Sequence, residues 1–363
     1  MPELYVGLMS GTSLDGIDAA LAELSGGKMR LLHSHYQPFQ PQLRENLLAL
    51  QDEARDELHR AALAANQLSH AYAAAIRTLL AQAEIPPDKI TAIGCHGQTV
   101  RHQPASGYTV QLVNGALLAE LSGITVVCDF RSRDIAAGGQ GAPLVPAFHH
   151  ELFHDASRHR VIVNIGGIAN VTNLSPDGIV TGFDCGPGNL LLDAWIMDNQ
   201  GKSFDQNGMW AAQGTILPEL LEALLAHDFF RLPPPKSTGR ETFNLAWLKR
   251  TCSGTEAAID VQATLLELTA ASISRAIAAH CHGAAEIFVC GGGARNLALV
   301  SRLQELLPGT KVDVTDVMGV DAEWLEALAF AWLAHQTMNG KPGNLPAATG
   351  ARGPRVLGAI YPS

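Results

Sequence analysis

The sequence has 363 residues, with 35 Asp or Glu against 25 Lys or Arg, and a formal net charge of −10. This acidic balance argues against a protein that binds nucleic-acid backbones, which needs a basic face, and no segment is apolar enough to span a bilayer. The size and the 47% hydrophobic content predict two domains. The six cysteines form no CxxC pair, and the N-terminus is unlike a signal peptide, which together predict reduced thiols in the cytoplasm.

The first part of the chain has the pattern of a β-meander followed by a helix. Three apolar strands are predicted at residues 4–9, 17–24 and about 29–36. Residues 42–83 have helical spacing, which predicts a helix that ends before Pro86 and Pro87. Further short strands are expected around residues 96–99, 108–113 and 124–130. The stretch 135–146 is rich in Gly and Pro and is the predicted crossing to a second domain.

The second part repeats the architecture of the first. Residues 161–174 again form an apolar strand, a small-residue turn and a strand, and residues 286–296 run from a strand into a triple-glycine turn. Helices are predicted at residues 189–199, 260–281, 297–307 and 321–336. Strands and helices alternate throughout, which predicts α/β layers.

The loop SGTSLDG at residues 10–16 is a candidate phosphate site. Its backbone N–H groups and the hydroxyls of Ser10, Thr12 and Ser13 can donate to anionic oxygens. Asp15 and Asp18 suit a Mg²⁺ ion that bridges phosphates. The alternative is an ordinary hairpin turn, where the same residue types are favoured. A second hairpin loop and a later glycine turn before a helix favour a nucleotide site.

Four shorter patterns carry less weight. GKS at residues 201–203 lacks the upstream glycine of a P-loop, and GGQG at residues 138–141 follows no strand. HELFH, with His150, Glu151 and His154, matches the zinc pattern HExxH but has no third-ligand extension. NVT at residues 170–172 fits a glycosylation sequon, but nothing marks the protein as secreted.

Asp184 in GFDCGPGN is the candidate catalytic base. It follows an apolar strand and precedes a Gly-Pro-Gly turn and a helix, so it can project into a cleft and take a proton during phosphoryl transfer. The alternative is a helix cap, although Asn189 is better placed for that task. HGQT at residues 96–99 suits a polyhydroxyl ligand, and Arg131 or Arg133 suits a ligand carboxylate; the alternative for each is a structural role.

Six segments taken together resemble the anhydro-N-acetylmuramic acid kinase family, within the actin/hexokinase/Hsp70 ATPase superfamily. In chain order they are GLMSGTSLDGIDAAL, GCHGQT, DFRSRDIAAGGQGAPLVP, VNIGGIANVT, GFDCGPGN and CGGGARN. The resemblance implies an α/β fold of duplicated actin-like ATPase (ribonuclease H-like) domains with an interdomain ATP cleft. We place the first domain at residues 1–137 plus about 342–363 and the second at 138–341, with hinges at 138–141 and 341–344.

The resemblance also assigns roles to residues. The catalytic base is Asp184, and the cofactors are ATP and Mg²⁺. The implied substrate-binding residues are His96, Gln98, Arg131 and Glu326, the last with a solvated helix face as its alternative. The implied ATP-binding residues are Gly11, Thr12, Ser13, Leu14, Asp15, Gly16, Ile17, Asp18, Gly166, Gly167, Gly291, Gly292, Gly293 and Asn296.

The reaction that this family carries out is unusual for a kinase. The 1,6-anhydro ring of 1,6-anhydro-N-acetylmuramic acid is opened by water and O6 is phosphorylated, which gives N-acetylmuramic acid 6-phosphate and ADP in peptidoglycan recycling and amino-sugar metabolism. Our hypothesis is that Asp184 deprotonates the water. The alternatives are another sugar kinase of the superfamily and an ATP-driven actin- or Hsp70-like switch. The expected partners are the amino sugar, ATP and a homodimer mate, for which the helix at 260–281 offers an apolar face, with neither nucleic acid nor membrane.

Overall fold

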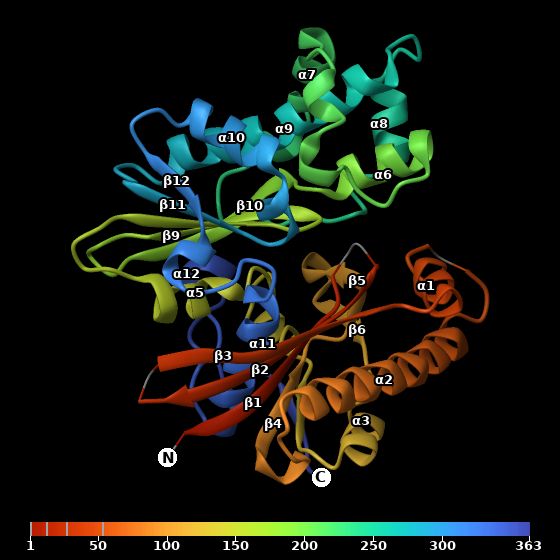
Figure 1. Ribbon diagram of the computed structural model, residues 1–363, viewed down its shortest axis with the longest axis vertical. Helices are drawn as coiled ribbons and strands as arrows, with labels where there is room; N and C mark the ends of the chain where they lie inside the picture. Colours follow the sequence, from red (N-terminus) through yellow and green to blue (C-terminus); the bar gives the residue numbers. More distant parts are fainter. Residues whose placement is uncertain (1, 12–13, 27, 53) are drawn as a thin grey trace. The chain divides into compact units, whose positions relative to one another are not determined.

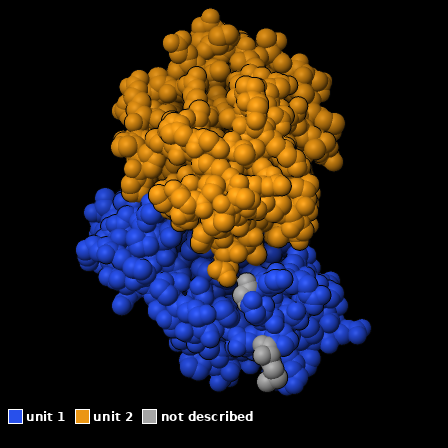
Figure 2. Space-filling view, turned by 90° about the vertical axis from the view of Figure 1, so that its left-hand side faces the viewer, with its two compact units in different colours: residues 1–148, 324–363 blue, residues 149–323 orange. Residues whose placement is uncertain are grey.

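The computed structural model describes residues 2–11, 14–26, 28–52 and 54–363. The chain folds into two compact units, coloured separately in Figure 2. The first consists of Met1–Phe148 and Trp324–Ser363, and the second of His149–Glu323. The crossing therefore lies inside helix α5 (Val145–Phe153), later than the predicted crossing at residue 138, and the return lies before the predicted one near residue 342.

Hydrogen bonds explain why the glycine-rich stretch belongs to the first unit. The Gln140 N–H donates to the Thr349 carbonyl oxygen at 2.7 Å, and the Arg352 N–H donates to the Ala137 carbonyl oxygen at 3.0 Å. Residues 138–141, predicted to be a hinge, are thus tied to the C-terminal segment of their own unit.

The first unit is built on a six-stranded sheet with the order β13-β7-β4-β1-β2-β3. Its strands are β1 (Glu3–Met9), β2 (Gly16–Ser25), β3 (Lys28–Pro38), β4 (Ile90–Cys95), β7 (Val126–Cys128) and β13 (Ala359–Tyr361). The strands β1, β2 and β3 form an antiparallel meander, whereas β4 pairs parallel to β1 and to β7. A separate hairpin joins β5 (Gln98–Gln103) to β6 (Tyr108–Leu112).

Helices cover both faces of this sheet (Figure 1): α2 (Glu57–Gln82) and α3 (Gly115–Ser122) pack on one face and α11 (Leu325–Met338) on the other. The unit also contains α1 (Pro41–Leu48), α4 (Ser132–Ala136) and α12 (Pro346–Thr349). The single helix predicted over residues 42–83 is thus two helices. The chain turns between them at Asp56, which has a left-handed φ of 57°, and Leu50 reaches the core from this turn.

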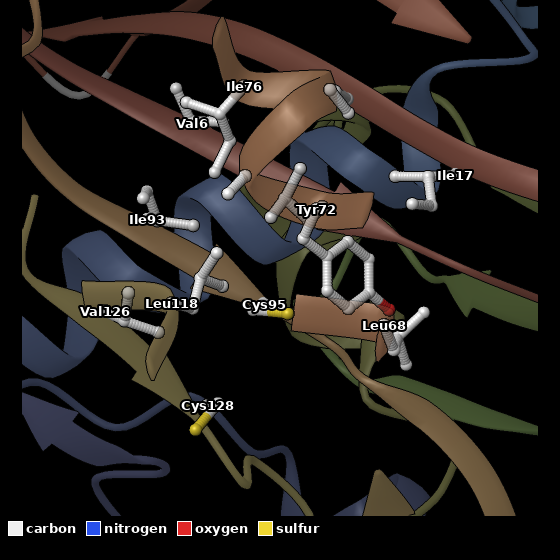
Figure 3. Close-up of a cluster of buried hydrophobic side chains, with 14 of the residues drawn as sticks. Val6, Ile17, Leu68, Tyr72, Ile76, Ile93, Cys95, Leu118, Val126 and Cys128 are labelled. Atoms are coloured by element: carbon white, nitrogen blue, oxygen red, sulfur yellow. The ribbon is translucent and has the colours of Figure 1, made fainter. Parts of the chain in front are cut away.

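Alternation along the strands determines which helix each side chain meets. Val6 of β1 and Ile93 of β4 pack in one core with Tyr72 and Ile76 of α2 (Figure 3). Gly7, between Val6 and Leu8, faces the opposite side, where it lies against the backbone of Ala327 in α11. The first sheet is therefore sandwiched, which is why β1 is apolar on both faces.

The second unit repeats this topology on a five-stranded sheet with the order β10-β9-β8-β11-β12. Its strands are β8 (Arg160–Ile165), β9 (Ile168–Leu174), β10 (Val180–Pro187), β11 (Glu286–Cys290) and β12 (Lys311–Val314). Again three strands form an antiparallel meander and a later strand, β11, joins the first strand of the meander in parallel. The predicted α/β duplication is confirmed by these two matching strand orders.

Five further helices belong to the second unit. They are α6 (Leu190–Gln200), α7 (Pro218–Leu225), α8 (Leu245–Thr251), α9 (Ala258–His280) and α10 (Leu297–Leu306). Residues 261–270 of α9 are all buried within the unit, because α6, α7 and α10 pack around the helix. The apolar stretch at 260–281, suggested from the sequence as a dimer face, is therefore largely enclosed by its own chain.

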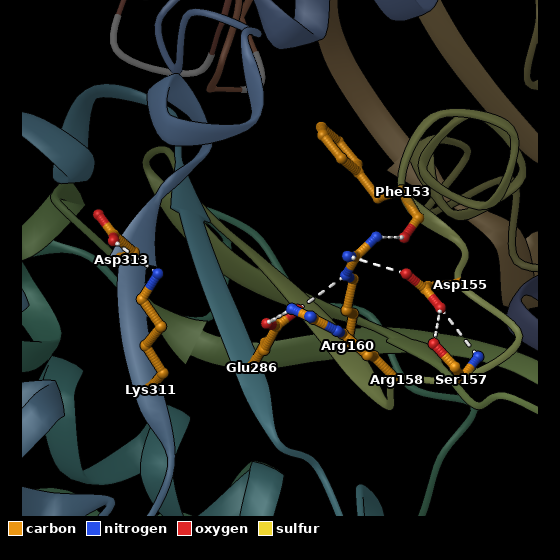
Figure 4. Close-up of polar contacts among 8 residues, drawn as sticks. All are labelled: Phe153, Asp155, Ser157, Arg158, Arg160, Glu286, Lys311 and Asp313. Atoms are coloured by element: carbon orange, nitrogen blue, oxygen red, sulfur yellow. Dashed lines mark hydrogen bonds and ion pairs between the residues drawn. The ribbon is translucent and has the colours of Figure 1, made fainter.

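Short 3₁₀ turns connect these elements at Pro87–Lys89, Pro104–Ser106, Gln206–Gly208, Ala211–Gln213, Asp228–Arg231, Gly292–Arg295 and Thr315–Met318. An ion-pair network fixes the parallel pair of β8 and β11 (Figure 4). Arg160 contacts Glu286 at 2.9 Å and Asp155 at 3.1 Å, and donates to the Phe153 carbonyl oxygen at 3.0 Å. Within the described ranges, no helix is both long and apolar enough to cross a membrane.

Candidate functional site

The loop after β1 is anchored to the chain that follows β4. The Ser10 hydroxyl lies 2.7 Å from the Tyr72 hydroxyl and donates to the Gly97 carbonyl oxygen at 3.2 Å. The Gln98 amide donates to the Gly11 carbonyl oxygen at 3.1 Å. Two segments 87 positions apart, both singled out from the sequence, are therefore in contact. Of the predicted ATP-binding residues, Thr12 and Ser13 lie outside the described residues.

The rest of this loop divides into buried anchors and outward carboxylates. Leu14 and Ile17 are fully buried, so only their backbone atoms can face a nucleotide. Leu14 adopts a left-handed φ of 56°. Asp15 is exposed and Asp18 is half-buried on β2. Burial, with added repulsion from these two carboxylates, raises the pKa of Tyr36 to about 12.

Asp15 and Asp18 have the chemistry that Mg²⁺ prefers, since it takes hard oxygen ligands. Among the residues that the structure describes, no three His, Cys, Asp or Glu side chains gather as a metal site. Asp15 and Asp18 are the residues of this loop that could hold a Mg²⁺ ion together with phosphate and water oxygens.

His96 and Arg131, predicted to face the sugar, lie side by side in the first unit. Arg131 directs its Nε and Nη2 atoms at His96 Nε2, at 3.2 and 3.0 Å, and its Nη1 donates to the Gly141 carbonyl oxygen at 2.7 Å. Burial and the Arg131 charge lower the pKa of His96 to about 3. The imidazole is therefore neutral and accepts at Nε2, which fixes its tautomer and orients the guanidinium.

Gln98 and Glu326 lie in the same neighbourhood. Gln98 is 1% exposed, and its Oε1 is buried with no hydrogen-bond partner among the described residues. Glu326 lies in the first turn of α11, one helical turn before Phe330, whose ring centroid is 4.8 Å from that of His96. Since residues i and i+4 share a helix face, Glu326 is on the face that carries Phe330 toward His96.

Asp184 is held near the end of β10, the edge strand of the second sheet. Its carboxylate Oδ2 accepts from the Thr238 N–H at 2.9 Å, and its own N–H donates to the Lys236 carbonyl oxygen at 3.1 Å. The side chain is buried at 7% exposure. The helix-cap alternative is wrong for both candidates, because the α6 cap position is Asn189 and its side chain donates to the Ile165 carbonyl oxygen instead.

Lys236 brings a cation beside Asp184. Its ammonium donates to the Phe229 carbonyl oxygen at 3.1 Å and lies 4.5 Å from the centre of that ring. Burial lowers the pKa of Lys236, against the opposing effect of the Cys185 and Asp184 charges. The region combines a buried carboxylate, a partly buried ammonium and an aromatic support, which is suited to proton transfer.

The glycine turns of the second unit have structural partners of their own. The carbonyl oxygens of Gly166 and Gly167 accept from the N–H groups of residues 188–190, at 2.8–3.1 Å. Side chains at Gly291 and Gly293 would collide with Asn164 or Ile165, so these positions need glycine for packing alone. A side chain added at Gly292 would meet no atom closer than 3.6 Å.

Asn296 uses its side chain locally. It caps α10 by accepting from the Leu299 N–H at 3.1 Å. Its predicted place beside adenosine, like the ATP contacts of the glycine turns, stays a prediction.

The metallopeptidase pattern does not develop into a metal centre. The rings of His150 and His154 lie 4.6 Å apart, as their i, i+4 spacing predicts, but His154 contacts the Ser175 carbonyl oxygen at 3.2 Å. In the described part of the chain no third ligand joins them.

Two residues beside Asp184 were missed from the sequence. Thr238 lies in the segment KSTGR, which has no helical or strand pattern and is 54 positions from Asp184. Asn170, which the sequence placed in a sequon and in the segment VNIGGIANVT without a role in the site, lies directly opposite Asp184 on β9. The signal for Thr238 was the cluster of basic and hydroxyl residues after three prolines, and the signal for Asn170 was its place in the second strand–turn–strand unit.

Comparison with known proteins adds to this geometry. A family model described as anhydro-N-acetylmuramic acid kinase matches residues 3–363. A protein of that name from Nitrosomonas europaea is 57% identical over 361 residues, which cover 99% of each chain. Another from Nitrosospira multiformis is 59% identical over 361 residues, again 99% of each chain.

Solved structures give more distant similarities. A ROK hexokinase from Thermus thermophilus aligns at 16% identity with a TM-score of 0.38, over 92% of this chain and 100% of that one. An activator of 2-hydroxyisocaproyl-CoA dehydratase from Clostridium difficile aligns at 12% identity with a TM-score of 0.47, over 93% and 96% of the two chains.

Proposed function

Because the chain belongs to the anhydro-N-acetylmuramic acid kinase family, we propose that it acts on 1,6-anhydro-N-acetylmuramic acid with ATP. It is a phosphotransferase with an alcohol group as acceptor. The observation that carries this function is the match over the whole chain, together with Asp184 buried near the end of a sheet edge strand. A match of this length favours the reaction over another sugar kinase or an ATP-driven switch.

We propose that Asp184 is the general base. In the anhydro sugar O6 is bonded to C1 and carries no proton, so the acceptor oxygen must first be released. Asp184 takes a proton from water, the water oxygen bonds to C1, and the C1–O6 bond breaks. O6 then takes the γ-phosphoryl group of ATP and ADP leaves, which gives N-acetylmuramic acid 6-phosphate. A buried carboxylate held by a backbone N–H at 2.9 Å supports this role.

We propose that the backbone of residues 11–18 contacts ATP phosphates. The burial of Leu14 and Ile17 supports contacts through main-chain atoms there. Asp15 and Asp18 are the residues that would hold Mg²⁺, which neutralises charge on the transferring group when bound. Gly166, Gly167, Gly291, Gly292, Gly293 and Asn296 are proposed as the remaining nucleotide contacts.

For the sugar, we propose contacts from His96, Gln98, Arg131 and Glu326. The unpartnered Oε1 of Gln98 can accept from a sugar hydroxyl. The neutral His96 orients the Arg131 guanidinium, and a guanidinium matches the planar geometry of a carboxylate, which supports contact with the lactyl group.

The cellular compartment and the oligomeric state are further proposals. All six cysteines are free thiols, which supports a reducing compartment such as the cytoplasm, where peptidoglycan recycling would use the product. The homodimer stays a prediction, and size-exclusion chromatography with light scattering would test it.

The test is ATP turnover with 1,6-anhydro-N-acetylmuramic acid in H₂¹⁸O, followed by mass analysis of the phosphorylated sugar. One ¹⁸O at C1, above the anomeric exchange seen in a product control, is the expected result. Phosphorylation without that label would keep the kinase and exclude water attack. No turnover on this sugar, with turnover on another, would overturn the assigned substrate.

Asp184→Asn tests the base directly. The amide retains an oxygen that can accept from the Thr238 N–H, so the local geometry is kept while the proton acceptor is lost. We expect kcat to fall by about 10²- to 10⁴-fold, the usual contribution of a general base, with little change in KM for the sugar. Near-normal turnover in steady-state assays would show that another group takes the proton.

A further inference from the structure

Two residues that flank Asp184 each have a buried side-chain oxygen without a hydrogen-bond partner among the described residues. These oxygens are Oδ1 of Asn170 and Oγ1 of Thr238. Buried polar atoms in native proteins are almost always hydrogen-bonded, so an exception calls for an explanation such as a catalytic role or a bound water. Two such atoms, on the residues that flank one carboxylate, are therefore suited to a small polar molecule bound there.

Strand pairing places Asn170 on one side of Asp184. The two residues are direct partners in the antiparallel pair of β9 and β10, so their side chains share a sheet face. The Asp184 N–H points to the outer edge of β10, toward Lys236, and not to β9. Asp184 and Asn170 are thus a non-hydrogen-bonded pair, the type in which opposite side chains lie closest.

Thr238 lies on the other side. The segment that contains it follows the outer edge of β10, which is the last strand of its sheet. The Thr238 N–H holds Asp184 Oδ2 at 2.9 Å, and the Thr238 hydroxyl is only three covalent bonds from that nitrogen. The carboxylate is therefore flanked by an amide oxygen and a hydroxyl.

Packing fixes the segment against the strand. Lys236 is bonded to the Phe229 carbonyl oxygen, and the Phe243 ring lies 5.6 Å from both Phe229 and Phe230. A side chain at Gly186, two residues after Asp184, would meet the Phe230 ring. The position of Thr238 is thus set by an aromatic cluster and not by the ligand.

We propose that Asn170 and Thr238 are further catalytic residues, which with Asp184 bind the attacking water. The water donates one proton to Asp184 and the other to Asn170 Oδ1, and it accepts from the Thr238 hydroxyl. Its remaining lone pair forms the bond to C1 while C1–O6 breaks and the first proton passes to Asp184. This inference rests on the proposed function of Asp184.

The arrangement makes the site selective for a nucleophile with two protons. Methanol has one proton, which it must give to Asp184, so it leaves Asn170 Oδ1 without a donor. The buried acceptor then lacks a partner, which disfavours methanol. The ratio of methyl glycoside 6-phosphate to free sugar 6-phosphate, formed in mixed water and methanol, measures this selectivity.

Asn170→Leu removes the acceptor and keeps the side-chain volume, while Asn170→Ala also opens space. We expect both variants to raise the methanolysis ratio at least about fivefold, with a reduced total rate. A rise in the Ala variant alone would show that space decides, and would overturn the role of Asn170. Asn173→Ala is the matched control, because Asn173 is on the same strand, faces the other side and pairs with His159 at 2.6 Å.

Thr238→Val removes the hydroxyl and leaves the backbone N–H that holds Asp184. We expect kcat to fall by about 5- to 100-fold at nearly unchanged KM values, with the methanolysis ratio within twofold of the parent, since both nucleophiles accept from the hydroxyl. Thr238→Ser is expected to restore most of kcat. A Ser variant as slow as Val would show a packing role and overturn the assignment of the hydroxyl.

Asp184→Asn, measured in parallel, separates the two proposals. Retained turnover in this variant would refute the proposed base. Collapsed turnover there, with Asn170→Leu and Thr238→Val both like the parent in rate and ratio, would refute only the water site.

Discussion

Two buried histidines of this protein, His96 and His149, and the half-buried His102 are held neutral. Burial lowers the pKa of His149 to about 3, and burial with the nearby Arg131 charge lowers those of His96 and His102 to about 3 and about 4. In each case the folded state prefers the uncharged ring more than the unfolded chain does. The stabilisation is present in full above the unfolded pKa of 6.5 and is lost as pH falls from 6.5 toward 3.

His149 offers the clearest test of this linkage, since it lies outside the proposed site. Its Nδ1 is 2.8 Å from the Thr172 hydroxyl, a contact that an Asn side chain can reproduce. Between pH 7 and 5 the parent should lose about 2 kcal/mol of unfolding free energy through this one group. His149→Asn should lose less over the same range, as measured by denaturant unfolding at each pH. Parallel pH profiles for the two proteins would contradict the neutral assignment.

The sequence could identify site residues that share a short segment, and it missed those that the fold brings in from elsewhere. His96 and Gln98 were singled out from HGQT, and Arg131 lies beside His96 as expected of a joint site. Thr238 could not be found, because its contact with Asp184 depends on a packed irregular segment 54 positions away. A local sequence pattern indicates which functional groups a segment contributes, whereas tertiary packing determines which of those groups come into contact.

At the scale of elements, α11 packs directly on the first sheet because the sheet has glycines, and so no side chains, at the place of contact. Gly7 of β1 and Gly94 of β4 are neighbours in parallel register, and both lie against the α11 backbone, at Ala327 and Phe330. Two adjacent glycines allow the helix to approach the sheet more closely than any side chain would permit. This approach places Phe330 against His96.

Gly94→Ala should separate α11 from the sheet. The added methyl would collide with the Phe330 carbonyl oxygen and meet the Ala334 methyl at 3.0 Å, and a backbone oxygen cannot move aside alone. We expect a loss of about 1–3 kcal/mol or more, seen as a Tm lowered by several degrees, and a weaker sugar affinity. Gly353→Ala is the control, since its nearest neighbour is the flexible end of Arg355. Equal stability of the two variants would contradict the close approach.

Element prediction succeeded where periodicity is local. The expected strands at residues 4–9 and 17–24 correspond to β1 and β2, and the helix at 321–336 is present as α11. The break between α1 and α2 was missed, because helical spacing continues on both sides of a turn. The unit to which α11 belongs was also missed, since membership depends on glycines more than 200 positions upstream in the chain.

At the scale of the whole molecule, the first unit is held together by contacts between its glycine-rich stretch near residue 138 and its C-terminal segment. Asp134, fully buried, accepts hydrogen bonds from three donors, two of which are 210 and 215 positions away in the chain. Its Oδ1 accepts from the Asn344 amide at 2.7 Å and from the Thr349 hydroxyl at 2.8 Å, and its Oδ2 accepts from the Gly141 N–H at 2.8 Å. This carboxylate explains why the glycine-rich stretch near residue 138, predicted as a crossing, is a fixed part of the unit.

Asp134→Ala should loosen both segments together. Each buried donor left without an acceptor costs about 1–3 kcal/mol, so we expect the first unit to lose several kcal/mol. In hydrogen-exchange mass spectrometry, protection should fall jointly in residues 134–141 and 344–352, although Asp134 and Asn344 are 210 positions apart. The strands β8–β12 should keep their protection, because the second unit has a core of its own.

Asp88→Ala provides the comparison, since Asp88 is an exposed acid of the same unit and its contact with Lys89, at 3.8 Å, is also exposed. Exposed pairs of this kind contribute little, so that variant should match the parent in exchange and in Tm. If Asp134→Ala instead loosened residues 134–141 while 344–352 stayed protected, the C-terminal segment would be held by other contacts. The first unit would then be closed by the packing of α11 and not by this buried carboxylate.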